Sequence, residues 1–149
     1  MLESIRKTFV LLFGEMHENL RKQVRGLDDG TLNWRPLPKA NSLAVLVTHV
    51  LGSELEMMRS VRSIPSPRDR ESEFHVELGA DRLLEMIDAA DLEMRELIAA
   101  VTEADLMELR PRGDRPPRPG IEWMTSNYGH AREHLAQIEL TKQLYDSRT

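Results

Sequence analysis

The sequence contains no cysteine. A disulfide, a thiolate nucleophile and a cysteine-based zinc site are therefore all excluded. Any thiol chemistry that this chain performs must use a thiol supplied from outside.

An excess of positive charge is also missing, since the net charge is -5 at pH 7. This balance argues against a nucleic-acid partner, because phosphate binding needs a dominant basic footprint. One local exception is residues 110–119, where four arginines stand against one aspartate just before the last predicted helix.

Long apolar runs are absent as well, and no stretch approaches the length needed to cross a membrane. The N-terminal apolar run, which ends at Phe13, is too short for a secretion signal, and Glu15 and His17 follow it in place of a cleavage site. We expect a cytoplasmic protein without a membrane partner.

Four amphipathic segments are present in the 149 residues. Apolar residues recur at spacings of three and four over residues 3–25, 42–62, 81–101 and 120–146, which predicts four helices of about 30 to 37 Å. Ser42 is the expected N-cap of the second, Gly26 ends the first, and residues 102–106 form a capped turn. Residues 27–41, 63–79 and 110–119 are expected to be loops. The prediction is one all-α domain over residues 1–149, a four-helix bundle of either up-and-down or crossover topology.

The last predicted helix carries His130 and His134, four residues apart. This spacing places both imidazoles on one face of a helix, within reach of one metal ion. The same face forms a polar stripe inside an apolar border, made of Trp123, Asn127, His130, His134, Gln137 and Thr141. We expect this stripe to face the interior rather than solvent.

His49 is the candidate third ligand. It lies at the edge of the core face of the second predicted helix, where a histidine is usually structural, and it gains interest from the matching pair. Three imidazoles with an open position are typical of a catalytic metal site. Asn127 and Gln137 are candidates for fixing an imidazole tautomer.

Several other side chains have two interpretations. Trp123 lines the mouth of a pocket or is an ordinary core aromatic. His17 is a boundary histidine of the first helix or lines the site, and His75 is expected to be exposed.

Competing metal chemistries find less support in the sequence. No histidine follows a glutamate by three residues, which excludes the motif of carboxylate-bridged di-iron bundles. Residues 130–134 match the His-x-x-Glu-His pattern of inverted zinc peptidases, but only 15 residues follow His134, too few for the distant third ligand. Neither a Gly-x-Ser-x-Gly motif nor a phosphate-binding glycine loop is present.

The sequence resembles the DinB/YfiT-like superfamily of metal-binding four-helix proteins. The resemblance rests on Leu32-Asn33-Trp34-Arg35-Pro36, then Asn41-Ser42-Leu43 and His49, and on residues 130–138. It implies an up-down-down-up bundle whose metal ligands are His49, His130 and His134. It also implies zinc or nickel, and a low-molecular-weight thiol activated by the metal for transfer to an electrophile.

Three hypotheses about function remain open. The first is the thiol transferase, with Arg35, Arg112 and Arg115 as candidates for holding a carboxylate of the thiol. The second is a non-catalytic stress-response or binding module with a structural or vestigial metal. The third is a metal-dependent hydrolase, for which His17 is the additional histidine that could serve as a base. In each case we expect a small-molecule ligand and self-association into a homodimer.

Overall fold

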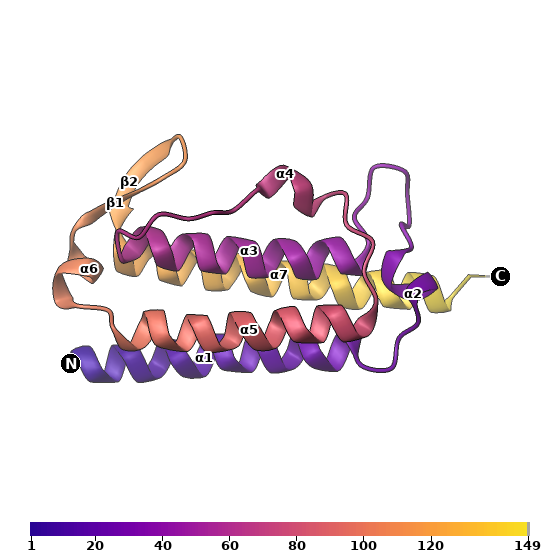
Figure 1. Cartoon of the computed structure of the whole chain (residues 1–149), viewed down its shortest axis with the longest axis horizontal. Helices are drawn as coiled ribbons and strands as arrows, with labels where there is room; N and C mark the ends of the chain where they lie inside the picture. The colour runs from indigo at the N-terminus through magenta and orange to yellow at the C-terminus, as the bar shows by residue number, and fades with distance from the viewer. Residues whose placement is uncertain (149) are drawn as a thin grey trace.

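Four long helices form a bundle in the computed structural model, which describes residues 1–148 (Figure 1). They are α1 (Leu2–Val24), α3 (Leu43–Val61), α5 (Ala80–Ala99) and α7 (Gly120–Asp146). The connections contain the short helices α2 (Asp29–Asn33), α4 (Arg70–Glu73) and α6 (Glu103–Met107) and the strands β1 (Leu109–Arg112) and β2 (Arg115–Pro119). The predicted all-α bundle is confirmed.

The topology is up-down-down-up. Helices α1 and α7 run in one direction, and α3 and α5 run in the other (Figure 1). Each of α1 and α3 packs against both α5 and α7. Because α3 and α5 are parallel, the link over residues 62–79 must return along the length of the bundle, and it carries α4 along one side of α3 (Figure 1).

The helix ends follow the local chemistry of the sequence. The Ser42 hydroxyl accepts a hydrogen bond from the backbone N–H of Val45, as expected of an N-cap. Gly26, with φ +77°, follows the end of α1 in the left-handed conformation that suits glycine. Thr102 and Asp105 form a reciprocal capping box at α6.

Residues 110–119 differ from the prediction. They were expected to form a loop and instead form most of an antiparallel hairpin in which Arg110 pairs with Arg118, with Gly113 in the turn at φ +59°. Prolines obscured the strands in the sequence, because proline cannot donate to a ladder. A two-stranded ribbon tolerates them, since each strand has a free edge. The other two expected loops each contain one short helix, α2 and α4.

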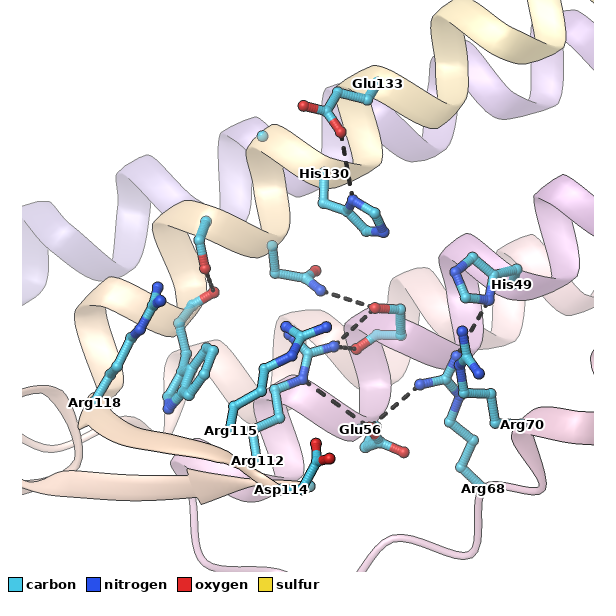
Figure 2. Close-up of a pocket in the computed structure, with 16 residues that line it drawn as sticks. His49, Glu56, Arg68, Arg70, Arg112, Asp114, Arg115, Arg118, His130 and Glu133 are labelled. Carbon is cyan, nitrogen blue, oxygen red and sulfur yellow. Dashed lines mark hydrogen bonds and ion pairs between the residues drawn. The ribbon is translucent and has the colours of Figure 1, made fainter.

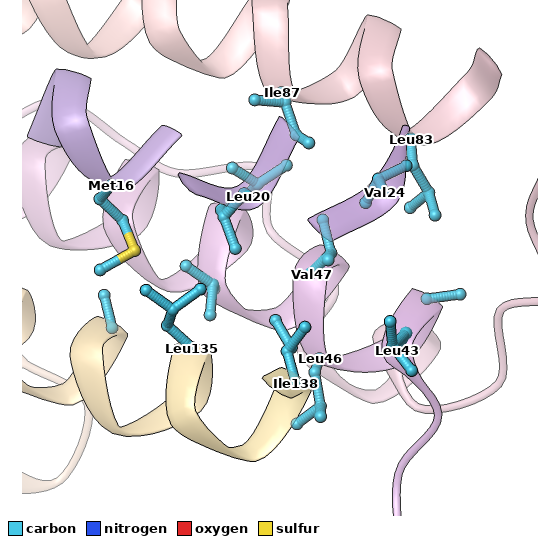
Figure 3. Packing of buried hydrophobic residues seen from close by; sticks show 14 of the residues in the cluster. Met16, Leu20, Val24, Leu43, Leu46, Val47, Leu83, Ile87, Leu135 and Ile138 are labelled. Carbon is cyan, nitrogen blue, oxygen red and sulfur yellow. The ribbon is translucent and has the colours of Figure 1, made fainter. Parts of the chain in front are cut away.

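The core is built from apolar side chains of all four long helices. One of its two clusters includes Leu20, Val47, Ile87 and Leu135, one from each long helix (Figure 3). This packing fixes the position of α3 against α7, the two helices that carry the candidate ligands. None of the helices within residues 1–148 is both long enough and apolar enough to span a bilayer.

Candidate metal centre

The three candidate histidines lie together at the junction of α3 and α7. His49 comes from α3, and His130 and His134 come from successive turns of α7. One ring nitrogen of each lies within 4.8 Å of a ring nitrogen of the other two. The Nε2 atoms of His130 and His134 are 3.0 Å apart.

Each of these imidazoles has its Nδ1 turned toward an oxygen acceptor. The pairs are His49 with Glu73 Oε1 at 3.1 Å, His134 with Gln137 Oε1 at 2.8 Å, and His130 with Glu133 Oε2 at 3.5 Å. An acceptor at Nδ1 favours the tautomer with the proton on that nitrogen; at His49 the Glu73 carboxylate is the closer contact, and Arg68 Nη2, a donor, lies farther away at 3.4 Å. The lone pair is then left on Nε2, the usual arrangement in histidine metal sites.

This donor set fits a divalent metal ion. Two Nε2 lone pairs facing each other at 3.0 Å repel unless a proton or a cation lies between them. Tetrahedral zinc with Zn–N bonds of about 2.0 to 2.1 Å would need nitrogens roughly 3.3 Å apart. This spacing lies between the 3.0 Å that separates the Nε2 atoms of His130 and His134 and the 4.8 Å within which all three ring nitrogens lie. Burial, aided by the neighbouring His130 and His49, lowers the pKa of His134 and keeps it neutral, as a ligand must be.

Glu73 holds His49 from the link between α3 and α5. Arg68 donates two hydrogen bonds of 2.8 Å to this carboxylate, one to each oxygen. Burial alone would raise the pKa of Glu73, but the hydrogen bonds from Arg68 and His49 outweigh burial and lower it. The carboxylate is therefore ionised when it faces His49.

Gly52 lets this carboxylate approach α3. A Cβ at position 52 would collide with the Glu73 carboxylate and would lie 3.1 Å from Arg68 Nε. The missing side chain thus allows the paired side chains of Glu73 and Arg68 to lie directly on α3, beside the His49 ring.

A cavity of about 660 Å³ opens beside the histidines (Figure 2). His49 and His130 are part of its wall. Five arginines also line it: Arg68, Arg70, Arg112, Arg115 and Arg118. Its acidic residues are Glu56, Asp114 and Glu133. The cavity is thus locally basic in a chain whose net charge is -5.

The other predicted site residues are distributed differently. Trp123 and Asn127 line the cavity, and Gln137 contacts an imidazole. Asn127 Nδ2 donates to the Ser53 hydroxyl at 3.0 Å rather than to a histidine. Arg35 donates to the carbonyls of Ala40 and Phe74 in the connecting loops and is not part of the cavity wall.

The polar stripe of α7 is only partly buried, which corrects the expectation that it faces the interior. Asn127 and Thr141 are buried, whereas the His130 side chain is 48% exposed and Gln137 is exposed. The middle of the stripe faces the cavity beside α3 rather than the core. Periodicity alone does not distinguish these two environments.

His17 is fully buried in the bundle, not at the edge of the apolar face of α1. Its Nε2 lies 2.7 Å from Glu54 Oε2, and its Nδ1 lies 2.8 Å from Asp91 Oδ1. It does not line the cavity, and both of its ring nitrogens are engaged. His17 is therefore unsuited to act as the base of a hydrolase at this centre.

Sequence reasoning missed Glu73, Arg68 and Gly52. The link that carries the first two has no helical periodicity beyond one short turn, so its side chains could not be assigned to a face. Gly52 lies within a predicted helix, where a glycine is unfavourable, and that cost was the one available hint of a close approach. His75 is exposed, as predicted.

Comparison with known proteins agrees with the bundle fold. The sequence model of the DinB superfamily matches residues 12–138. The chain belongs to the DinB superfamily. No curated protein matches its sequence.

Solved structures share the fold of this DinB-superfamily chain at low sequence identity. A conserved protein from Enterococcus faecalis has a TM-score of 0.79 and 14% identity, with 97% of this chain and 98% of that chain covered. A DinB-like protein from Bacillus cereus has a TM-score of 0.78 and 15% identity, with 94% and 92% covered. A mycothiol-dependent maleylpyruvate isomerase has a TM-score of 0.69 and 13% identity, with 93% of this chain and 62% of that chain covered.

Proposed function

We propose that this DinB-superfamily chain is a metal-dependent enzyme that transfers a low-molecular-weight thiol to an electrophile. His49, His130 and His134 are the protein ligands, and zinc or nickel suits a set of three imidazoles. The observation that carries the proposal is the convergence of three imidazoles, two of which, His49 and His130, lie in the wall of an open cavity. A purely structural zinc site would be closed by a fourth protein ligand.

The bound metal would supply the means to hold the thiol sulfur as a thiolate at neutral pH. The sulfur then forms a bond to an electrophilic carbon of the second substrate, and the leaving group departs with the electron pair of the broken bond. The thiol proton is lost to solvent or buffer. Because the chain has no cysteine, the reacting sulfur must belong to the small molecule.

The protein contributes orientation and a shaped space. Glu73 and Gln137 hold the His49 and His134 rings through Nδ1. The cavity, about 660 Å³ in volume, has room for a thiol and an electrophile side by side. The mycothiol-dependent isomerase that shares this fold supports a thiol as the cosubstrate.

The first experiment is elemental analysis of the purified wild type beside a His49→Ala, His130→Ala, His134→Ala variant that retains its helical circular dichroism. We expect about one divalent ion per wild-type chain and none in the variant. Glutathione, bacillithiol and mycothiol are then tested with a chloronitrobenzene and an epoxide, with conversion followed by mass spectrometry.

The two other hypotheses give different results in the same assays. One ion per chain with no thiol-dependent conversion would favour a binding module with a non-catalytic metal. Ester or amide hydrolysis that needs the metal and no thiol would favour a hydrolase. Absence of metal after incubation with zinc, nickel and manganese would refute the proposed site itself.

A further inference from the structure

The arginines of the cavity are not explained by metal binding. Within residues 1–148, Arg70, Arg115 and Arg118 form no ion pair with a carboxylate. Arg118 stacks on the Trp123 ring, with its guanidinium carbon 5.0 Å from the ring centroid, and Arg70 stacks similarly on Phe74 at 5.2 Å. Several guanidinium groups thus face one cavity without anionic partners inside the protein.

Arg112 is more constrained than the exposed Arg70, Arg115 and Arg118, because its side chain is only 11% exposed. Its Nη2 donates to the hydroxyl and carbonyl oxygens of Ser53 at 2.8 and 3.3 Å. The nearest carboxylate, Glu56, lies 4.0 Å from its Nε and also pairs with Arg68 at 3.2 Å. A buried cation normally has a close anionic partner, and Arg112 lacks one.

Burial lowers the pKa of Arg112 to about 10; the charge of Glu56 opposes this shift, and the positive charges of Arg115 and Arg68 add to it. The guanidinium is still charged at neutral pH, and its desolvation is an energetic cost that the distant Glu56 only partly offsets. An anion in the cavity would remove that cost.

The hairpin presents these arginines on a stiff support. A proline precedes Arg112, another follows Arg115, and prolines flank Arg118 on both sides. Proline fixes the backbone φ angle, so less conformational freedom is lost when the arginines engage a ligand. Trp123 Nε1 ties the base of the hairpin to α7 by donating to the Arg110 carbonyl at 2.8 Å.

We propose that the cavity between the β1–β2 hairpin and α3 is a binding site for a small organic anion with at least two negative charges, anchored by Arg112 and Arg115. The charged groups are carboxylates or phosphates, which guanidinium forks bind with the same geometry. The anion would be a substrate of the proposed thiol transfer, and this role rests on the proposed function. Binding of the anion itself does not require the metal.

Isothermal titration of the wild type with succinate, inorganic phosphate and neutral succinamide tests this site, in both the metal-loaded and the metal-free protein. We expect succinate, phosphate or both to bind at millimolar or lower concentration, with an affinity that falls as salt rises, and succinamide not to bind. Binding of succinate alone identifies a dicarboxylate site, and binding of phosphate alone identifies a phosphate site. Failure of both anions to bind, or equal binding of succinamide, would overturn the inference.

Variants locate the site. Arg115→Gln changes an exposed side chain without an ion pair and should weaken binding roughly tenfold, and Arg112→Gln should weaken it by up to roughly a hundredfold. Arg82→Gln, at an exposed arginine on α5, is the matched control and should bind like the wild type. Unchanged binding by a folded Arg115→Gln variant would contradict the assignment, even if Arg112→Gln fails to fold.

The triple histidine variant separates the two proposals. Anion binding that persists when the metal is lost would support this inference whatever the outcome of the thiol assays. Metal binding and thiol transfer without anion binding would support the proposed function and refute the anion site.

Discussion

The Nδ1 atom of His49 lies 3.1 Å from the carboxylate of Glu73, a residue of the link between α3 and α5. A candidate ligand on the bundle is thus oriented by a group that is not part of the bundle helices. Because Arg68 neutralises the same carboxylate, His49 is not required to become charged. The orientation of this ligand therefore depends on the path of the link.

Replacing Glu73 with Gln should lower metal affinity about tenfold or more, the effect usual for removal of a group that orients a histidine ligand. Competition with a chromophoric chelator measures the affinity. Glu71→Gln, on the same link but 81% exposed at its side chain, is the matched control and should leave it unchanged. Equal affinities for the two variants would contradict the role given to Glu73.

Gly52→Ala should give two opposite effects. Alanine favours a helix over glycine by about 1 kcal/mol, so α3 alone should become more stable. The added Cβ collides with Glu73, however, so metal affinity should fall as in Glu73→Gln. Gly14→Ala is the control, because a Cβ at position 14 meets nothing within 4 Å. It should raise the free energy of unfolding and leave metal affinity unchanged; a similar result for Gly52→Ala would remove the proposed reason for glycine at that position.

The buried cluster of His17, Glu54 and Asp91 should make stability depend on pH. Burial lowers the pKa of His17, but Glu54 and Asp91 together outweigh burial and raise it above 6.5. Burial also raises the pKa of Glu54. The raised pKa values of His17 and Glu54 both refer to one proton, which the two side chains share in the folded state. The stabilisation is complete below pH 6.5, the ordinary value for histidine, and is lost as pH rises through the pKa of the folded state.

Urea unfolding of the metal-free protein between about pH 6 and pH 9 tests this sign. The free energy of unfolding should fall with rising pH, by at most about 1.4 kcal/mol per pH unit for one proton. The lowered pKa of His134 makes the free energy of unfolding rise with pH near pH 6.5. This contribution is the same in the wild type and in a His17→Gln variant. The difference between wild type and variant therefore isolates the proton shared by His17 and Glu54, and a difference that stays constant with pH would refute the prediction.

The capping box at α6 should support the hairpin. Asp105 accepts from the Thr102 backbone and also pairs with Arg62 and Arg110, the latter at the start of the hairpin. Thr102→Ala should lower the free energy of unfolding by about 1 kcal/mol, the usual effect of losing an N-cap. Thr125→Ala, at an exposed position within α7, should cost less. Similar losses at both positions would argue against a specific role for the cap.

The bundle and the paired ligands were predictable because both depend on helical spacing. Apolar residues at three and four define the long helices, and the same geometry places His130 beside His134. His49 was selected because those two residues required a partner and because the resemblance supplied one. The three candidate ligands were therefore accessible from the sequence.

The surroundings of the ligands were not predictable, because they depend on segments without periodicity. Glu73 reaches His49 only through the path of the link across α3. Arg112 reaches Ser53 only because a proline-rich segment forms a hairpin. Helical spacing within α1 placed His17 at the edge of the apolar face. Its burial depends on Glu54, which comes from another helix and could not be paired with it from spacing alone.

The parallel arrangement of α3 and α5 has a consequence for how such proteins diversify. It obliges the chain to return along the bundle, and that return carries Arg68 and Glu73 across the ligand-bearing face. Insertions and substitutions in the link, or in the hairpin at the end of the bundle, can alter the ligand pocket while the apolar core is left intact. A lineage could in this way keep its three histidines and change which molecules the cavity accepts through changes in two surface segments.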